Sequence, residues 1–219
     1  MHGTAPNLWG ELPAMLAADH RVMSYDRRSF GRSVSAPVAS LRRHTQDAVR
    51  LLESLAEGAS TLVGWSAGGL IALDLAATSP ELVSGVVVIE AALFAKRRLS
   101  PDQLRMIVAA KLQSARGRPR DGAERFLRWA LQRRGESNDL DRLPEPWREA
   151  MLANAATILR EIDGGTGERE LGRGALAGVR CPVRWLYGDR SARTFEAAAR
   201  RARSHIPQVS VVPVERPVT

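Results

Sequence analysis

The chain has 219 residues, of which 44% are hydrophobic, and it contains one cysteine. This length suits one hydrophobic core with a small additional unit but hardly two full domains, and a single cysteine excludes a disulfide within the chain. The formal net charge is +8 at pH 7, carried almost entirely by arginines scattered along helical segments. We therefore expect no nucleic-acid partner, although a basic nucleic-acid-binding protein is kept as an alternative.

The N-terminal sequence MHGTAPNLW has neither the basic nor the apolar region of a signal peptide, which favours a cytoplasmic location. The most apolar stretch, LVSGVVVIEAALFA, is too short to span a membrane and contains Glu90. We expect a cytoplasmic protein without a membrane partner. The sequence does not indicate an oligomeric state.

Strand-like and helix-like segments alternate along most of the chain. Residues 21–26 form a short β-rich run, residues 39–58 have helical periodicity, and residues 60–65 again resemble a strand. The later segments are expected to be helices at 66–80 and 192–206 and strands at 83–89, 182–187 and 208–213. This alternation predicts an α/β fold with a parallel sheet covered by helices.

The pattern changes between residues 93 and 178. Arg-rich amphipathic helices are expected here at 99–116, 121–135 and 145–162, followed by a glycine-rich segment. Insertions on the carboxyl side of parallel strands border the ligand crevice. We therefore expect a discontinuous core of residues 1–92 and 179–219, with residues 93–178 as a helical cap above it.

The stretch LVGWSAGGL places Ser66 between two glycines, at the junction of a buried strand and a helix. This Gly-x-Ser-x-Gly arrangement is typical of a nucleophile elbow, a tight turn that lifts the serine to the head of the helix. The N–H of Ala67 and the positive end of the helix can then face a developing oxyanion. The alternative is a glycine-rich turn made only for strand-to-helix packing.

A second segment, HGTAPNLWGELPAMLAADHRVMSYDRRSFGRS, resembles the opening of α/β-hydrolase domains. The resemblance covers nearly the whole chain outside the cap. It implies a hydrolase acting on an ester-like or other acyl bond of a small molecule, without a cofactor or a metal, and it places the oxyanion N–H groups on Thr4 and Ala67. One departure is Ser29, where the family turn usually has glycine.

Two carboxylates compete for the role of catalytic acid. In many α/β-hydrolases the acid follows the strand equivalent to VRWLYG by about three residues, where this chain has Ser191, while Asp189 comes directly after the glycine. Some relatives carry the acid at the end of the strand after the elbow helix, and there the chain has Glu90. We favour Glu90 over Asp189. Glu90 could instead be a hinge residue hydrogen-bonded to backbone.

The catalytic base cannot be assigned. Family members carry a histidine in a loop after the last strand, where this chain has ERPVT. Of the four histidines, His2 belongs to the oxyanion turn, His20 precedes a strand and His205 ends a helix on the far side. His44 is expected to be a surface residue. Without a base, a serine hydroxyl attacks poorly.

The chain also lacks the central strand that normally leads into the His-Gly pair, which would leave strand edges unpaired. We expect a chain truncated at both ends. Its function is then either that of a serine hydrolase with Ser66 as nucleophile, or that of an impaired or inactive relative that binds a small molecule or a partner.

Overall fold

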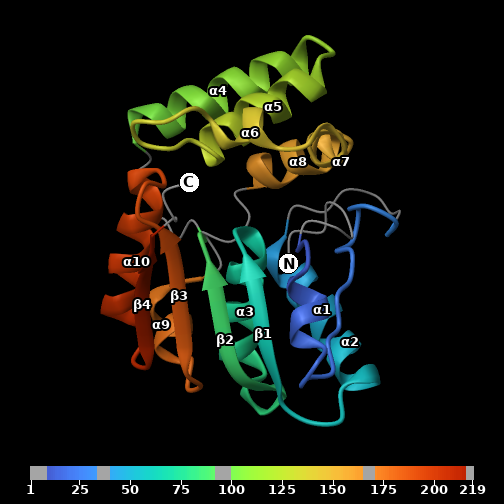
Figure 1. The fold of residues 1–219 in the computed structure, drawn as a ribbon, viewed down its shortest axis with the longest axis vertical. Coiled ribbons are helices and arrows are strands. Elements are labelled where there is room, and N and C mark those ends of the chain that lie inside the picture. The colour runs from blue at the N-terminus through green and yellow to red at the C-terminus, as the bar shows by residue number, and fades with distance from the viewer. Residues whose placement is uncertain (1–8, 34–39, 92–99, 165–170, 216–219) are drawn as a thin grey trace.

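The computed structural model describes residues 9–33, 40–91, 100–164 and 171–215. Their four strands form one parallel sheet, in the order in which they occur along the chain (Figure 1). The strands are β1 (Ser60–Trp65), β2 (Val83–Ile89), β3 (Val183–Gly188) and β4 (Val209–Val214). The α/β-hydrolase type of sheet expected from the sequence is therefore present, with each of these strands within one residue of its expected position.

The strands form where apolar runs are covered on both faces. In β2, Val86 and Val88 are buried, and in β3 Trp185 is fully buried against the same core. Helix α3 (Ala67–Thr78) packs against β1 and β2, and α10 (Arg193–His205) packs against β3 and β4. The remaining helices around the sheet are α1 (Leu12–Leu16), α2 (Leu41–Leu55), the 3-10 helix η1 (Pro80–Leu82) and α9 (Arg173–Ala177).

The expectation of a fifth strand at residues 21–26 is wrong. This segment lies between α1 and the turn at Ser29 and pairs with no strand of the described chain. A strand requires a neighbour for its backbone groups, and among the described residues nothing fills the position between this segment and β1. Its β-rich composition therefore does not produce a strand.

Five helices lie together beyond the carboxyl ends of the strands, where the arrowheads point in Figure 1. We call them the cap: α4 (Pro101–Ala115), α5 (Pro119–Ala130), α6 (Asp139–Arg142), α7 (Glu145–Leu152) and α8 (Ala155–Gly164). Helix α4 begins at a capping box, in which the Ser100 and Gln103 side chains bond to each other's backbone N–H. The cap helices contribute Leu127, Met151 and Ile158 to a second hydrophobic cluster, which also contains Phe30 from outside the cap.

Two cap helices end differently from the expectation. The helix expected at 145–162 is divided into α7 and α8 at Asn154, whose side-chain oxygen accepts a hydrogen bond from the N–H of Gly31 at 3.0 Å. The helix expected at 121–135 ends at Ala130, because the next residues leave it to contact the loop after β3. There the N–H of Arg134 donates to the carbonyl of Arg190 at 2.8 Å. Both changes arise from contacts between the cap and the sheet side of the molecule.

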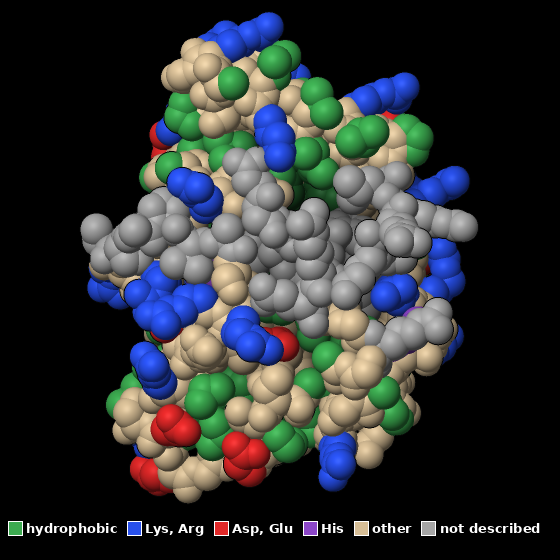
Figure 2. Space-filling view, turned by 180° about the vertical axis from the view of Figure 1, so that it is seen from behind, with side chains coloured by type: hydrophobic (Ala, Val, Ile, Leu, Met, Phe, Trp, Pro, Cys, Tyr) green, Lys and Arg blue, Asp and Glu red, His purple; other side chains and the backbone are tan. Residues whose placement is uncertain are grey.

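Arginine and lysine side chains are spread over the face shown in Figure 2 and do not gather in one stripe. Many arginines pair with carboxylates, such as Arg128 with Asp141 at 2.8 Å and Arg190 with Glu136 at 2.5 Å. No helix in the described ranges is long and apolar enough to cross a bilayer.

Candidate active site

Ser66 occupies the turn between β1 and α3. Its backbone has φ 53° and ψ −122°, a conformation that residues other than glycine rarely adopt. The N–H of Ser66 donates to the carbonyl of Ile89 at 2.8 Å, which fixes the turn to the end of β2. Ala67 is the first residue of the 12-residue helix α3, so its N–H has no acceptor within the helix.

Glycine is required at this turn because the strand and the helix approach very closely. A Cβ on Gly64 would lie 2.4 Å from the backbone carbon of Gly68, and a Cβ on Gly69 would lie 2.8 Å from Val88. Glycine at position 64 of the motif, and at the neighbouring position 69, therefore has a steric cause, and the geometry is that of the expected elbow.

Glu90 follows β2 and also has a positive φ, 47°. Its Oε1 accepts a hydrogen bond from the N–H of Gly188 at 3.1 Å and a short one from the Ser191 hydroxyl. Glu90 and Ser66 line the same cavity, covered from above by cap residues that include Leu127. The volume of this cavity is about 20 Å³, which is room for one water molecule and less than a histidine ring needs.

Asp189 lies elsewhere. It is absent from the lining of the Ser66 cavity, its N–H donates to the carbonyl of Val214 at 3.1 Å, and its carbonyl accepts a hydrogen bond from the Arg134 side chain. Within the described residues, its buried Oδ1 has no hydrogen-bond partner. Of the two candidate acids, Glu90 is therefore the one that shares a cavity with Ser66.

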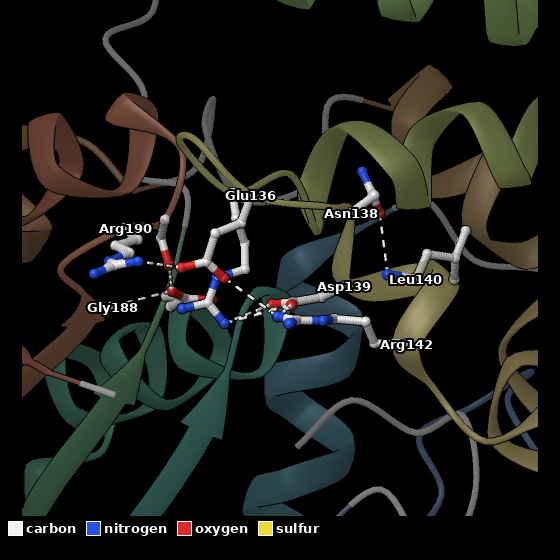
Figure 3. A network of polar contacts seen from close by, with 10 residues as sticks. Glu136, Asn138, Asp139, Leu140, Arg142, Gly188 and Arg190 are labelled. Atoms are coloured by element: carbon white, nitrogen blue, oxygen red, sulfur yellow. Dashed lines mark hydrogen bonds and ion pairs between the residues drawn. The ribbon is translucent and has the colours of Figure 1, made fainter. Parts of the chain in front are cut away.

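A network of polar contacts connects the cap to the loop that carries Asp189 and Ser191 (Figure 3). Glu136, between α5 and α6, accepts from the guanidinium of Arg190 at 2.5 Å and from that of Arg142 at 3.2 Å. The hydrogen bond from Arg190 holds the pKa of Glu136 below its usual value. Because the Ser191 hydroxyl donates to Glu90, this network helps to position the acid candidate.

None of the described histidines lines the Ser66 cavity. His20 is exposed, and the Nδ1 of His205 lies 2.8 Å from the carbonyl of Arg201 within its own helix. His2 and Thr4 lie outside the described residues. No group of three His, Cys, Asp or Glu side chains in the described part of the chain could hold a metal ion.

The expectation that His44 lies on the surface is wrong. Its side chain is 1% exposed, and its Nε2 lies 3.0 Å from Oε1 of Glu161 in the cap. One signal in the sequence could have indicated this burial: His44 falls on the stripe of α2 that also carries Leu41, Ala48 and Leu52, at helical spacing.

Glu161 also forms a buried ion pair with Arg27. Nη1 of Arg27 lies 2.6 Å from Oε1 and Nη2 lies 3.3 Å from Oε2, while the guanidinium stacks over Phe30 at 4.2 Å from the ring centre. Burial raises the pKa of Glu161, but the charge of Arg27 and the hydrogen bonds from His44 and Arg27 outweigh it and bring the pKa to about 2. Nothing in the sequence pattern around Arg27 or Glu161 indicated that these two residues are partners.

Comparison with known proteins agrees with this geometry. A family model described as "Alpha/beta hydrolase family" matches residues 1–218. The chain is 32% identical over 175 residues to a pimeloyl-[acyl-carrier protein] methyl ester esterase of Edwardsiella ictaluri, an alignment that covers 74% of this chain and 66% of the esterase. It is 37% identical over 91 residues to "Putative carbamate hydrolase RutD" of Variovorax paradoxus, where the match covers 41% of this chain and 34% of that protein.

Solved structures have the same fold. An alpha/beta hydrolase from Sphaerobacter thermophilus superimposes with a TM-score of 0.73 and 23% identity, over 95% of this chain and 80% of its own. A bromoperoxidase from Bacillus anthracis gives a TM-score of 0.73 with 24% identity, over 94% of this chain and 77% of its own. With the elbow at Ser66, the parallel sheet and a family match along almost the whole sequence, the chain belongs to the alpha/beta hydrolase family.

Proposed function

We propose that the protein is a serine hydrolase that cleaves an ester-like or other acyl bond of a small molecule through nucleophilic attack by Ser66. The observation that carries the proposal is the shared cavity of Ser66 and Glu90 at the head of α3. A hydroxyl held in a strained turn beside a helix N-terminus is suited to acyl transfer. The similarity to the methyl ester esterase of E. ictaluri supports this proposal, because that protein is named for an ester bond.

The proposed reaction has two steps. The Ser66 oxygen bonds to the acyl carbon while its proton passes to a base, and the alcohol leaves with a proton. Water then attacks the acyl-serine ester and releases the acid. The N–H of Ala67, together with that of Thr4, would stabilise the oxyanion, and Glu90 would orient and stabilise a protonated base.

A second candidate is an impaired relative that binds a small molecule or a partner without turnover. The observation that favours it is that no described histidine reaches the Ser66 cavity, whose volume holds only one water. Loss of the base alone can lower turnover by about a million-fold, whereas oxyanion donors and binding retain roughly a thousand-fold over water. The chain is then expected to hydrolyse an activated aryl ester feebly at most.

Labelling with a fluorophosphonate tests whether Ser66 is the nucleophile. The probe forms a phosphonyl ester with a reactive serine and releases fluoride, so mass spectrometry of a digest locates the adduct. We expect one adduct on the peptide that contains Ser66, lost in Ser66→Ala and retained in Ser84→Ala, which changes an exposed serine on β2. A folded chain without an adduct on Ser66 would overturn the hydrolase proposal and favour the binding protein.

A further inference from the structure

One side of α4 is apolar and exposed. Leu104, Val108 and Leu112 are 54%, 55% and 49% exposed. A spacing of four residues places them in a row on the same side of the helix. Six large hydrophobic side chains are exposed in the described chain, and because three of them form this row, they are grouped and not scattered. We call the row the α4 stripe.

The opposite side of α4 is the one that packs inside the cap. Gln103 and Ala110 are buried there, and α4 contacts α5 and α8. The helices approach closely, since a Cβ on Gly122 of α5 would lie 2.6 Å from the carbonyl oxygen of Ala110. Helix α4 lies on the side of the cap that is remote from the sheet (Figure 1), and none of its residues lines the Ser66 cavity. The α4 stripe therefore serves neither the interior of the cap nor that cavity.

Cations border the α4 stripe on both sides. At about 3.6 residues per turn, Lys111 lies along one side of it, and Arg105 and Arg116 lie along the other. Residues 101–116 hold these three cations and one carboxylate, that of Asp102. Asp102 pairs with Arg105 at 3.3 Å, but both side chains are 80% exposed, so water screens the pair. On the cap in Figure 2, hydrophobic side chains likewise reach the surface beside basic ones.

These borders disfavour two kinds of occupant. A second copy of the chain, packed stripe against stripe, would bring like charges together. A stable protein interface uses about 20–30 residues on each side, whereas the α4 stripe is roughly 12 Å long and has three apolar side chains. A bilayer with anionic lipids fits better, because it accepts the apolar side of one helix and attracts lysine and arginine at its surface.

We propose that α4 docks the protein on the surface of a bilayer that contains anionic phospholipids. The helix lies in the plane of the membrane, with Leu104, Val108 and Leu112 in the headgroup region and the bordering cations near the lipid phosphates. Contact of this kind requires one exposed amphipathic helix and no membrane-spanning segment. It does not involve the Ser66 hydroxyl, so it is independent of the proposed hydrolase activity.

Vesicle flotation of the full chain tests the proposal. The probes are vesicles of phosphatidylcholine alone and vesicles of phosphatidylcholine mixed equally with phosphatidylglycerol. We expect binding to the mixed vesicles to be at least about tenfold tighter and to weaken as salt is added. Absence of binding to the mixed vesicles, or equal binding to both kinds, would overturn the proposal.

A double variant tests whether the α4 stripe makes the contact. Leu104→Gln/Leu112→Gln removes two of its apolar side chains, and leucine and glutamine have similar helix propensities. We expect this variant to bind the mixed vesicles at least about fivefold more weakly. The matched control is Leu55→Gln, which changes a leucine of α2 that is 46% exposed, and its binding should not change. Equal binding by the double variant and the unmodified chain would overturn the proposal.

The cations are tested in the same way. Arg116→Gln should weaken binding to the mixed vesicles, whereas Arg203→Gln, which changes an exposed arginine of α10, should not. Equal losses in the two variants would mean that the net charge of the protein drives binding, and would overturn the assignment to α4. If the double variant does not fold, Val108→Gln replaces it in the test. A dimer in sedimentation that the leucine substitutions dissociate would assign the α4 stripe to a second copy and overturn the proposal.

Discussion

Oε1 of Glu161 in the cap lies 2.6 Å from Nη1 of Arg27, which follows the extended segment at residues 21–26. The side chains of Glu161 and Arg27 are 10% and 1% exposed. They are 134 residues apart in the sequence, so the pair joins two distant parts of the chain. Removal of one member leaves the other charge buried without its partner, which is more costly than loss of a surface pair.

We therefore expect Glu161→Gln to lower the free energy of unfolding by about 3–5 kcal/mol. Urea denaturation measures this change. The matched control is Glu149→Gln, which disrupts a half-exposed, solvent-screened pair with Arg120 and is expected to lower the free energy of unfolding much less. Equal effects of the two substitutions would mean that the buried pair does not contribute as argued.

The same carboxylate makes stability depend on pH. The pKa of Glu161 is about 2 in the folded chain, against an ordinary value of 4.5. Because the folded pKa is the lower one, the ionised Glu161 stabilises the folded chain at pH values above the unfolded pKa, and this stabilisation is lost as the pH falls from about 5 toward 2. We expect the free energy of unfolding to fall by roughly 3 kcal/mol over this range. Urea denaturation at several pH values should give a flatter profile for Glu161→Gln, and parallel profiles would contradict the assignment.

The choice between the two acid candidates can be tested at Ser66. We expect Glu90→Gln to slow fluorophosphonate labelling of Ser66, because Glu90 shares the cavity with it, and Asp189→Asn to leave the labelling rate within about twofold. Circular dichroism would establish that both variants are folded. The reverse order of effects would assign the acid to Asp189.

Close packing at the elbow predicts a large effect of one methyl group. Gly64→Ala places a Cβ 2.4 Å from the backbone of Gly68, which no side-chain rotation can relieve, and we expect a loss of at least about 2 kcal/mol. Gly58→Ala is the control, because a Cβ there has nothing within 4 Å. Denaturation midpoints of the two variants give the comparison, and a tolerated Gly64→Ala would mean that the turn is looser than described.

The sequence predicted most of the sheet because each strand from β1 to β4 is a short run rich in β-branched and other apolar residues that alternates with helical segments. It failed at residues 21–26, where strand formation depends on a neighbour and not on composition. Local pattern also located Ser66, because a glycine-flanked turn between strand and helix is a short-range signal. The position of Glu90 at the end of the strand after the elbow helix also favoured it over Asp189, and in the structure Glu90 lines the cavity of Ser66.

The contacts that hold the cap could not be read from the sequence. Glu161 looks like one more charged position of an amphipathic helix, and Arg27 like one more arginine in a basic chain. Only the three-dimensional fold brings them together with His44, and only their shared burial distinguishes them from the many surface pairs.

Three residues other than glycine have a positive φ in the described chain: Ser29, Ser66 and Glu90. Each such conformation costs on the order of 1–3 kcal/mol, so substitution by glycine at these positions could raise the free energy of unfolding. A library selected only for thermal resistance should accumulate glycine at 66 and 90, the residues proposed to carry the chemistry. Selection for thermal stability would then favour glycine at these two positions, whereas selection for a higher reaction rate would retain serine and glutamate.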